Sequence, residues 1–109
     1  GWRREGLDLY TTASIPFTTA VFGGEALIQT LHGAVLCKIQ PFTQSGTKIR
    51  LKGKGICPAG SSSAKGDHYV TVQIEVPQSL DRESAAKLRE FERTYARKEA
   101  QNRSRGSAA

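Results

Sequence analysis

The sequence predicts a mainly β protein, a small two-layer β sandwich with a short helix after the first strand and an amphipathic helix near the C-terminal end. Three observations support this prediction. Residues 68–76 alternate apolar and polar side chains, which is typical of a strand with one buried face. Residues 26–39 contain two apolar runs around a glycine-containing turn, which indicates a hairpin. After Pro77 the apolar residues recur every three or four positions, which indicates a helix.

The first strand is expected over residues 9–15, because the run LYTTASI is rich in β-branched and aromatic residues. Pro16 ends it, since proline has no N–H to donate to a neighbouring strand. The next stretch, PFTTAVFGG, begins with a proline suited to the first turn of a helix and ends with Gly23 and Gly24, which favour a helix stop. A short helix or turn is therefore predicted there.

The apolar runs 26–31 and 34–39 are separated by His32 and Gly33, and glycine tolerates the positive φ that a two-residue hairpin turn requires. We expect a hairpin, with His32 as an exposed turn residue. Alternation then predicts a strand over residues 48–54, with Ile49 and Leu51 on the buried side. Its other side is cationic and consists of Lys48, Arg50, Lys52 and Lys54. The small, polar segment 58–67 is expected to form a mobile surface loop before the strand at 68–76.

The C-terminal helix is predicted over residues 81–100. Asp81 is a suitable N-cap, and Glu83 places a negative charge in the first turn, where it interacts favourably with the helix dipole. Leu88, Phe91 and Tyr95 form one apolar stripe, and charges of both signs form a solvated face around it. Residues 101–109 lack an apolar period and are expected to be disordered, so one domain is expected over residues 1–100.

Composition narrows the possible functions. The net charge of +6 raises the possibility of an anionic partner. Cys37 and Cys57 have no neighbouring cysteine or histidine at zinc-ligand spacing, so we expect no metal and two reduced thiols, which fits a cytosolic setting. No apolar run is long enough to cross a bilayer. No motif for nucleophilic catalysis or nucleotide binding is present, so we expect neither an enzyme nor a cofactor.

Six fragments appear in a distinctive order: WRREGLDLY, AVFGGE, TLHG, TQSGTKIRLKGKG, GDHYV and VPQSL. Together, over about residues 2–92, they resemble the second C-terminal β domain of DnaJ-type co-chaperones. Trp2 stands where the family usually has phenylalanine, and Phe42 stands where its I-P-x-G-T-Q pattern has glycine. The matching residues include Arg4, Gly6, Asp8, Leu9, Tyr10, Ala20, Gly23, Gly24, Thr30, Leu31, Gly33, Thr43, Gln44, Gly46, Arg50, Leu51, Gly53, Lys54, Gly55, Gly66, Asp67 and Val70.

The resemblance implies a co-chaperone fragment that helps to hold unfolded client polypeptides and pairs two copies of its parent protein. The family acts with a DnaK-type ATPase through a J domain with an H-P-D motif, which this sequence lacks. The candidates for client contact are Phe17, Val21, Phe22 and Phe42, for which packing in the core is an equal alternative. The candidates for dimerisation are Leu88, Phe91 and Tyr95, which would otherwise pack on their own domain.

Two other functions compete with this one. The cationic strand at residues 48–54 suggests a β module that binds nucleic acid. Such modules interleave exposed aromatic residues with their basic ones, whereas here Ile49 and Leu51 occupy the interleaved positions. The remaining alternative is a purely structural domain that dimerises and does not protect clients.

Overall fold

The computed structural model describes residues 1–58 and 65–107, so most of the predicted loop at 58–67 lies outside the described residues. The chain divides into two compact units, Gly1–Val76 and Pro77–Ala109, and each is described by itself. The second unit contains one helix, α2 (Arg82–Ser107). The elements of the first unit are β1 (Arg3–Glu5), β2 (Asp8–Pro16), α1 (Phe17–Phe22), β3 (Gly24–Thr30), β4 (Gly33–Ile39), β5 (Lys48–Leu51) and β6 (His68–Glu75).

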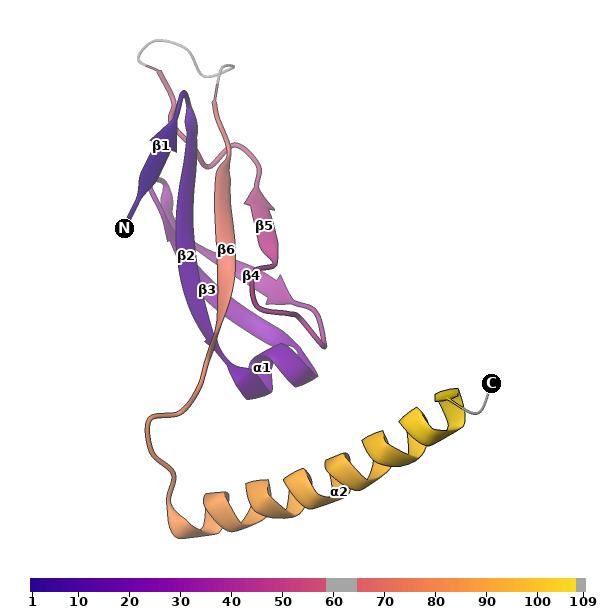
Figure 1. Cartoon of the computed structure of the whole chain (residues 1–109). Helices are drawn as coiled ribbons and strands as arrows, with labels where there is room; N and C mark the ends of the chain where they lie inside the picture. Colours follow the sequence, from indigo (N-terminus) through magenta and orange to yellow (C-terminus); the bar gives the residue numbers. More distant parts are fainter. Residues whose placement is uncertain (59–64, 108–109) are drawn as a thin grey trace. The chain divides into compact units, whose positions relative to one another are not determined.

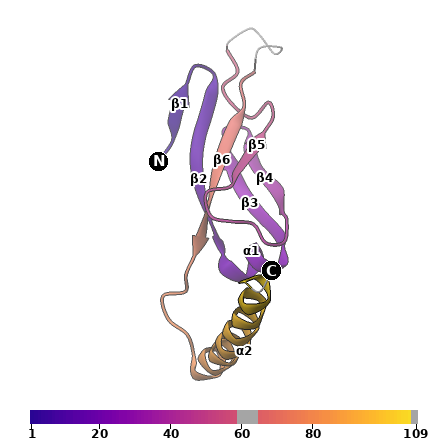
Figure 2. The ribbon, with the colours of Figure 1, turned by 45° about the vertical axis from the view of Figure 1, so that its right-hand side comes forward.

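Two sheets make up the first unit, as the sequence predicted. Four strands form one sheet in the order β1-β2-β6-β5, and β3 and β4 form a separate hairpin. β2 and β6 run parallel, with Leu9 opposite His68 and Pro16 opposite Glu75, while the other pairs are antiparallel. The hairpin lies across one face of the larger sheet (Figures 1 and 2). The result is a small two-layer sandwich.

The core lies between the two layers and contains two apolar clusters, each built from both sheets. The cluster nearer α1 is formed by Ile15, Ala20, Ile39 and Val72. The other cluster is formed by Ile28, Cys37, Leu51 and Val70. Val70 and Val72 are almost completely buried, because alternate residues of β6 face the hairpin. The alternation predicted for residues 68–76 is therefore confirmed as far as Glu75, whereas Val76 lies after β6 and is 76% exposed. Leu51 is buried as predicted, and Ile49 is partly buried against both clusters.

Several element boundaries differ from the prediction, and Pro16, which was expected to end the first strand, is its last residue. β1 was not predicted; it pairs with β2 through a turn at Gly6, whose φ is +61°. The hairpin turn consists of residues 31 and 32, because Gly33 already pairs with Thr30. β5 ends at Leu51, since a turn begins at Lys52 and Gly53 has a φ of +73°.

The second unit begins with the predicted cap. The Asp81 carboxylate accepts a hydrogen bond from the backbone N–H of Ser84 at 3.1 Å, which satisfies a first-turn donor without an intrahelical partner. α2 then continues past Ala100, where the apolar pattern predicted its end, as far as Ser107. An ion pair between Glu99 and Arg103 at 3.6 Å links the predicted part of the helix to this extension. Whether the helix forms one domain with residues 1–76 stays a prediction.

Cys37 is buried and Cys57 is exposed, and both are thiols. Burial raises the pKa of Cys37. Over residues 1–58 and 65–107, no helix is long and apolar enough to cross a membrane.

Candidate functional site

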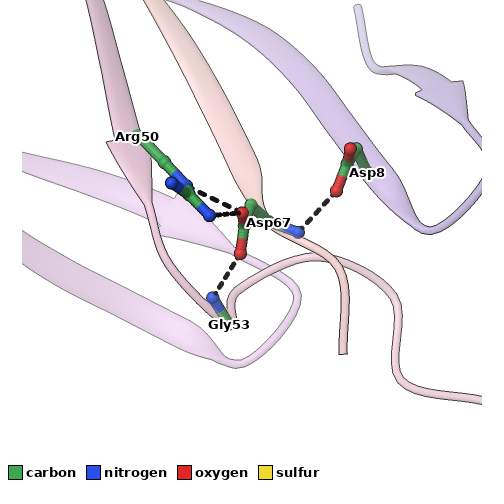
Figure 3. A network of polar contacts seen from close by, with 4 residues as sticks. All are labelled: Asp8, Arg50, Gly53 and Asp67. Carbon is green, nitrogen blue, oxygen red and sulfur yellow. Dashed lines mark hydrogen bonds and ion pairs between the residues drawn. The ribbon is translucent and has the colours of Figure 1, made fainter. Parts of the chain in front are cut away.

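The residues that carry the motif pattern assemble into a polar network centred on Asp67 (Figure 3). One carboxylate oxygen of Asp67 accepts a hydrogen bond from Nε of Arg50 at 2.8 Å and forms an ion pair with the same guanidinium at 2.6 Å. The other accepts from the backbone N–H of Gly53 at 2.8 Å. The backbone N–H of Asp67 donates to the Asp8 carboxylate at 2.7 Å. The Gly53 N–H and the Arg50 guanidinium lower the pKa of Asp67.

Two motif glycines allow three backbone segments to meet beside this network. A Cβ at Gly66 would lie 2.0 Å from the carbonyl oxygen of Leu7, and one at Gly55 would lie 2.5 Å from the same oxygen. Ile56 donates its N–H to that oxygen at 2.8 Å, and Gly55 donates to Gly66 at 3.0 Å. Only glycine fits such close backbone contact. These motif residues therefore join the β1–β2 turn, the end of β5 and the start of β6, and their role is structural.

His68 is a polar residue inside the core. It is fully buried, its Nε2 is hydrogen-bonded to the Thr11 hydroxyl at 2.7 Å, and its Nδ1 has no partner among the described residues. The Trp2 ring lies against the imidazole, with ring centroids 5.1 Å apart, so Trp2 links the N-terminal segment to the core. Burial lowers the pKa of His68, which favours the neutral imidazole. His32, by contrast, lies exposed at the hairpin turn, and its Nε2 donates to the carbonyl oxygen of Gly55 at 2.8 Å.

The four predicted client-contact residues lie at one end of the first unit, and the structure separates them by exposure. Phe17 is half-buried at the start of α1, and Val21 is marginally exposed. Phe22 and Phe42 are 77% and 74% exposed, which is unusual for aromatic side chains. The packing alternative therefore fits Phe17 best, whereas Phe22 and Phe42 are available for contact with a partner.

Backbone hydrogen bonds hold the turn that carries Phe42 against α1. Phe42 donates its N–H to the carbonyl oxygen of Val21 at 3.1 Å, and Thr43 donates to that of Ala20 at 2.9 Å. Phe42 itself has a φ of +63° and is the one non-glycine residue with positive φ among the described residues. A large side chain in this conformation is strained. The position that resembles a family glycine therefore holds an exposed aromatic ring on a constrained backbone.

Part of the cationic strand is engaged in contacts within the sheet. Arg50 is paired with Asp67. Its cross-strand neighbour Tyr69 stacks on Tyr10 with ring centroids 5.2 Å apart, and the Arg3 guanidinium lies over the Tyr10 ring at 4.7 Å. The stacking faces of Tyr10 are thus occupied from within the sheet, whereas base stacking requires an open ring face.

The apolar stripe of α2 is present as predicted. Phe91 and Tyr95 are exposed and stack with ring centroids 5.6 Å apart. Sequence reasoning missed Leu80, which is exposed just before the helix and lies outside the helical periodicity. The residues that line a shallow hollow here are Leu80, Ala85, Leu88, Arg89, Phe91 and Glu92.

The sequence matches one known protein family over the whole of the first unit. Residues 1–77 match the family model described as the DnaJ C terminal domain. The chain belongs to the DnaJ C-terminal domain family. The match covers the complete β unit, including the residues of the Asp67 network.

Several curated relatives carry the name "Chaperone protein DnaJ". The protein from Lachnospira eligens is 34% identical over 96% of this chain and 28% of its own length. Those from Caldicellulosiruptor bescii and Burkholderia mallei are both 44% identical, over 84% and 87% of this chain and 24% and 25% of their own lengths. The chain thus spans about a quarter of the length of these DnaJ relatives.

Proposed function

We propose that this chain holds unfolded client polypeptides on exposed apolar side chains and pairs two copies of a DnaJ-type parent protein, without catalysing a reaction itself. Membership of the DnaJ C-terminal domain family supports a co-chaperone role. The exposure of Phe22 and Phe42 is the observation that carries the client-holding part. Unfolded polypeptides differ from folded ones in exposing apolar side chains, which a persistent apolar surface selects.

The rigidity of the aromatic pair favours this function. The backbone at Phe42 is fixed through the hydrogen bonds from residues 42 and 43 to α1, and Phe22 lies at the end of the same helix. A surface that is already ordered loses less conformational entropy when a client binds. A client therefore meets two aromatic side chains on an ordered backbone and does not have to order a loop.

The client-holding part is tested by suppression of aggregation, measured as light scattering from a chemically unfolded client protein. Burying two phenyl rings contributes at least about 2 kcal/mol, so Phe22→Ser combined with Phe42→Ser should require more than about tenfold higher chain concentration for equal protection. Val76→Ser is the matched control, because it removes an exposed apolar side chain just after β6. Equal protection by the double variant would contradict the assignment of these residues.

The stripe on α2 supports the pairing of two copies. Leu88, Phe91 and Tyr95 lie on one face, and each contributes roughly 1.5–3 kcal/mol if a partner removes it fully from water. The other faces of the helix carry exposed ion pairs, such as Glu83 with Lys87 at 3.4 Å, and these faces can stay in water when the stripe is covered. Two copies joined in this way raise the effective concentration of client-holding surfaces.

The pairing is tested by sedimentation equilibrium of the full chain. Phe91→Asp should convert a dimer to a folded monomer, since a carboxylate in the apolar contact loses its hydration without a partner. Ala86→Asp adds the same charge at an exposed position away from the stripe and should stay dimeric. If the Phe91→Asp chain has the same mass as the unmodified chain, the helix does not mediate pairing.

The partners belong to the same proposal. They are unfolded polypeptides, a second copy and, through the parent protein, a DnaK-type ATPase in a cytosolic setting, with no membrane and no cofactor. A purely structural dimerisation domain would pair normally and leave client aggregation unchanged. A nucleic-acid module would bind a labelled oligonucleotide with a steep salt dependence, which the ion pair between Arg50 and Asp67 and the occupied Tyr10 ring disfavour.

A further inference from the structure

The core of the β unit contains an imidazole with a single polar partner. His68 is fully buried, and its Nε2 is hydrogen-bonded to the Thr11 hydroxyl, whereas its Nδ1 has no partner among the described residues. A neutral imidazole carries one N–H, but an imidazolium carries one on each nitrogen. Protonation would therefore place a positive charge and an unpaired donor inside the core, which the closed structure disfavours.

The carboxylates of the surrounding elements do not act as counter-ions for this charge. They are Glu5 on β1, Asp8 on β2, Glu25 on β3, Asp67 just before β6 and Glu75 at its end. Asp8 and Asp67 accept other hydrogen bonds in the network of Figure 3. Glu5 is exposed and pairs with Arg3 at 3.8 Å, and Glu25 and Glu75 are exposed as well.

The other titratable groups around His68 do not supply an acceptor either. They are Arg3 and Arg4 on β1, Tyr10 on β2, Cys37 and Lys38 on β4, Lys48 and Arg50 on β5, and Tyr69 on β6. Tyr69 and Arg50 lie on the opposite face of the sheet, because neighbouring residues of a strand alternate. Arg4 is a donor only, and its Nε already donates to the carbonyl oxygen of Gly6 at 2.8 Å. Burial, and no neighbouring charge, therefore lowers the pKa of His68.

One side of the imidazole is covered by a weakly held edge strand. The Trp2 ring lies against His68 and is 50% exposed. β1 follows it, consists of three exposed residues and pairs only with β2 in the described part of the chain, at the edge of the sheet (Figures 1 and 2). Residues 2–5 contribute to neither core cluster. A segment with so few buried contacts opens at a much lower free energy than the core does.

We infer that residues 2–5 form an acid-sensitive cover over His68: protonation of the imidazole releases Trp2 and β1 while the remaining strands stay folded. Opening lets water solvate the imidazolium and accept its second N–H. It exposes the Trp2 indole and the edge of β2 that β1 covers. The β unit thus presents additional apolar surface in mildly acidic surroundings. This switch involves neither Phe22, Phe42 nor α2, so it does not depend on the proposed function.

The direction of the switch follows from proton binding. In the closed form burial lowers the pKa of His68, whereas in the open form the hydrated imidazole titrates near about 6.5. The open form therefore binds the proton more readily, and each unit of pH below about 6.5 favours opening by up to about tenfold. The Gly53 N–H and the Arg50 guanidinium lower the pKa of Asp67, so the network beside the cover keeps its charge while His68 titrates.

The test measures how strongly acrylamide quenches the fluorescence of Trp2, the single tryptophan of the full chain. Between pH of about 7.5 and 5 the quenching constant should rise about twofold, because a half-exposed ring becomes fully exposed. His68→Gln cannot take up the proton and should give the same constant at both pH values. His32→Gln is the matched control: it removes the exposed histidine and should behave as the unmodified chain does.

Hydrogen exchange of the unmodified chain distinguishes local opening from unfolding and does not depend on the variant. At pH of about 5 the paired amides of β1 should lose most of their protection, and those of Val70 and Val72 in the core should keep it. An unchanged quenching constant in the unmodified chain overturns the inference. A rise that persists in His68→Gln, or that His32→Gln abolishes, overturns the role of His68. Loss of protection in β6 together with β1 would mean that the whole unit unfolds and that no cover opens.

Discussion

Replacement of Phe42 by alanine and by glycine tests the backbone geometry that presents the aromatic pair. Both changes remove the ring, so their difference isolates the φ of +63° at this position. A non-glycine residue in the left-handed region is strained by about 1–2 kcal/mol. Glycine avoids this strain but loses about 0.5–1 kcal/mol more backbone freedom on folding. Phe42→Gly should therefore be more stable than Phe42→Ala by about 0.5–1 kcal/mol.

The difference is measurable by thermal or urea unfolding. In a domain of this size it corresponds to roughly 2–8 °C in Tm. Gln40 is the matched control, because it is exposed in the same connection and has a negative φ. There the order should reverse, and Gln40→Ala should be more stable than Gln40→Gly by about 0.4–1 kcal/mol. If alanine is also the more stable replacement at Phe42, the strain argument is refuted.

Two further predictions concern buried positions. Stability should fall as the pH drops from about 7.5 to 5: burial lowers the pKa of His68 in the folded state, whereas the unfolded histidine titrates near about 6.5 and binds the proton more readily. Urea midpoints measured at the two pH values should show this loss of stability. The loss should be smaller in His68→Gln. An equal loss in the variant would mean that other groups cause it. Gly66→Ala should destabilise the fold by at least about 2–3 kcal/mol, because its Cβ would lie 2.0 Å from the Leu7 carbonyl oxygen. Thermal unfolding measures this, with the exposed Ser14→Ala as control, and a similar Tm for both variants would contradict the close backbone contact.

Local patterns predicted the local elements. The alternation in residues 68–76, the two apolar runs around Gly33 and the helical stripe after Asp81 each depend on neighbouring residues, and all three elements formed. The parallel pairing of β2 with β6 was not predicted, because it joins Leu9 to His68 across most of the chain. No local signal encodes which of several strands become neighbours.

The sequence predicted only part of the site, because the exposure of a side chain depends on which segments pack together. Phe22 and Phe42 were candidates, but their exposure depends on how the turn after β4 folds back on α1. The exposure of Leu27 and Leu36 was not predicted, because both lie in apolar runs without alternation, which are typical of strands buried on both faces. The partners of the half-buried Asp67 became evident only once β5, β6 and the first turn were placed together.

The central claim is that this domain works by surface contact with unfolded polypeptide. NMR titration of the isotopically labelled chain with one protein, first permanently unfolded and then in its folded form, tests it most directly. The unfolded form should shift the signals of Phe22 and Phe42 and leave those around Asp67 in place, and the folded form should shift neither set. Equal responses to both forms, or shifts centred on Asp8, Arg50 and Asp67, would contradict the account.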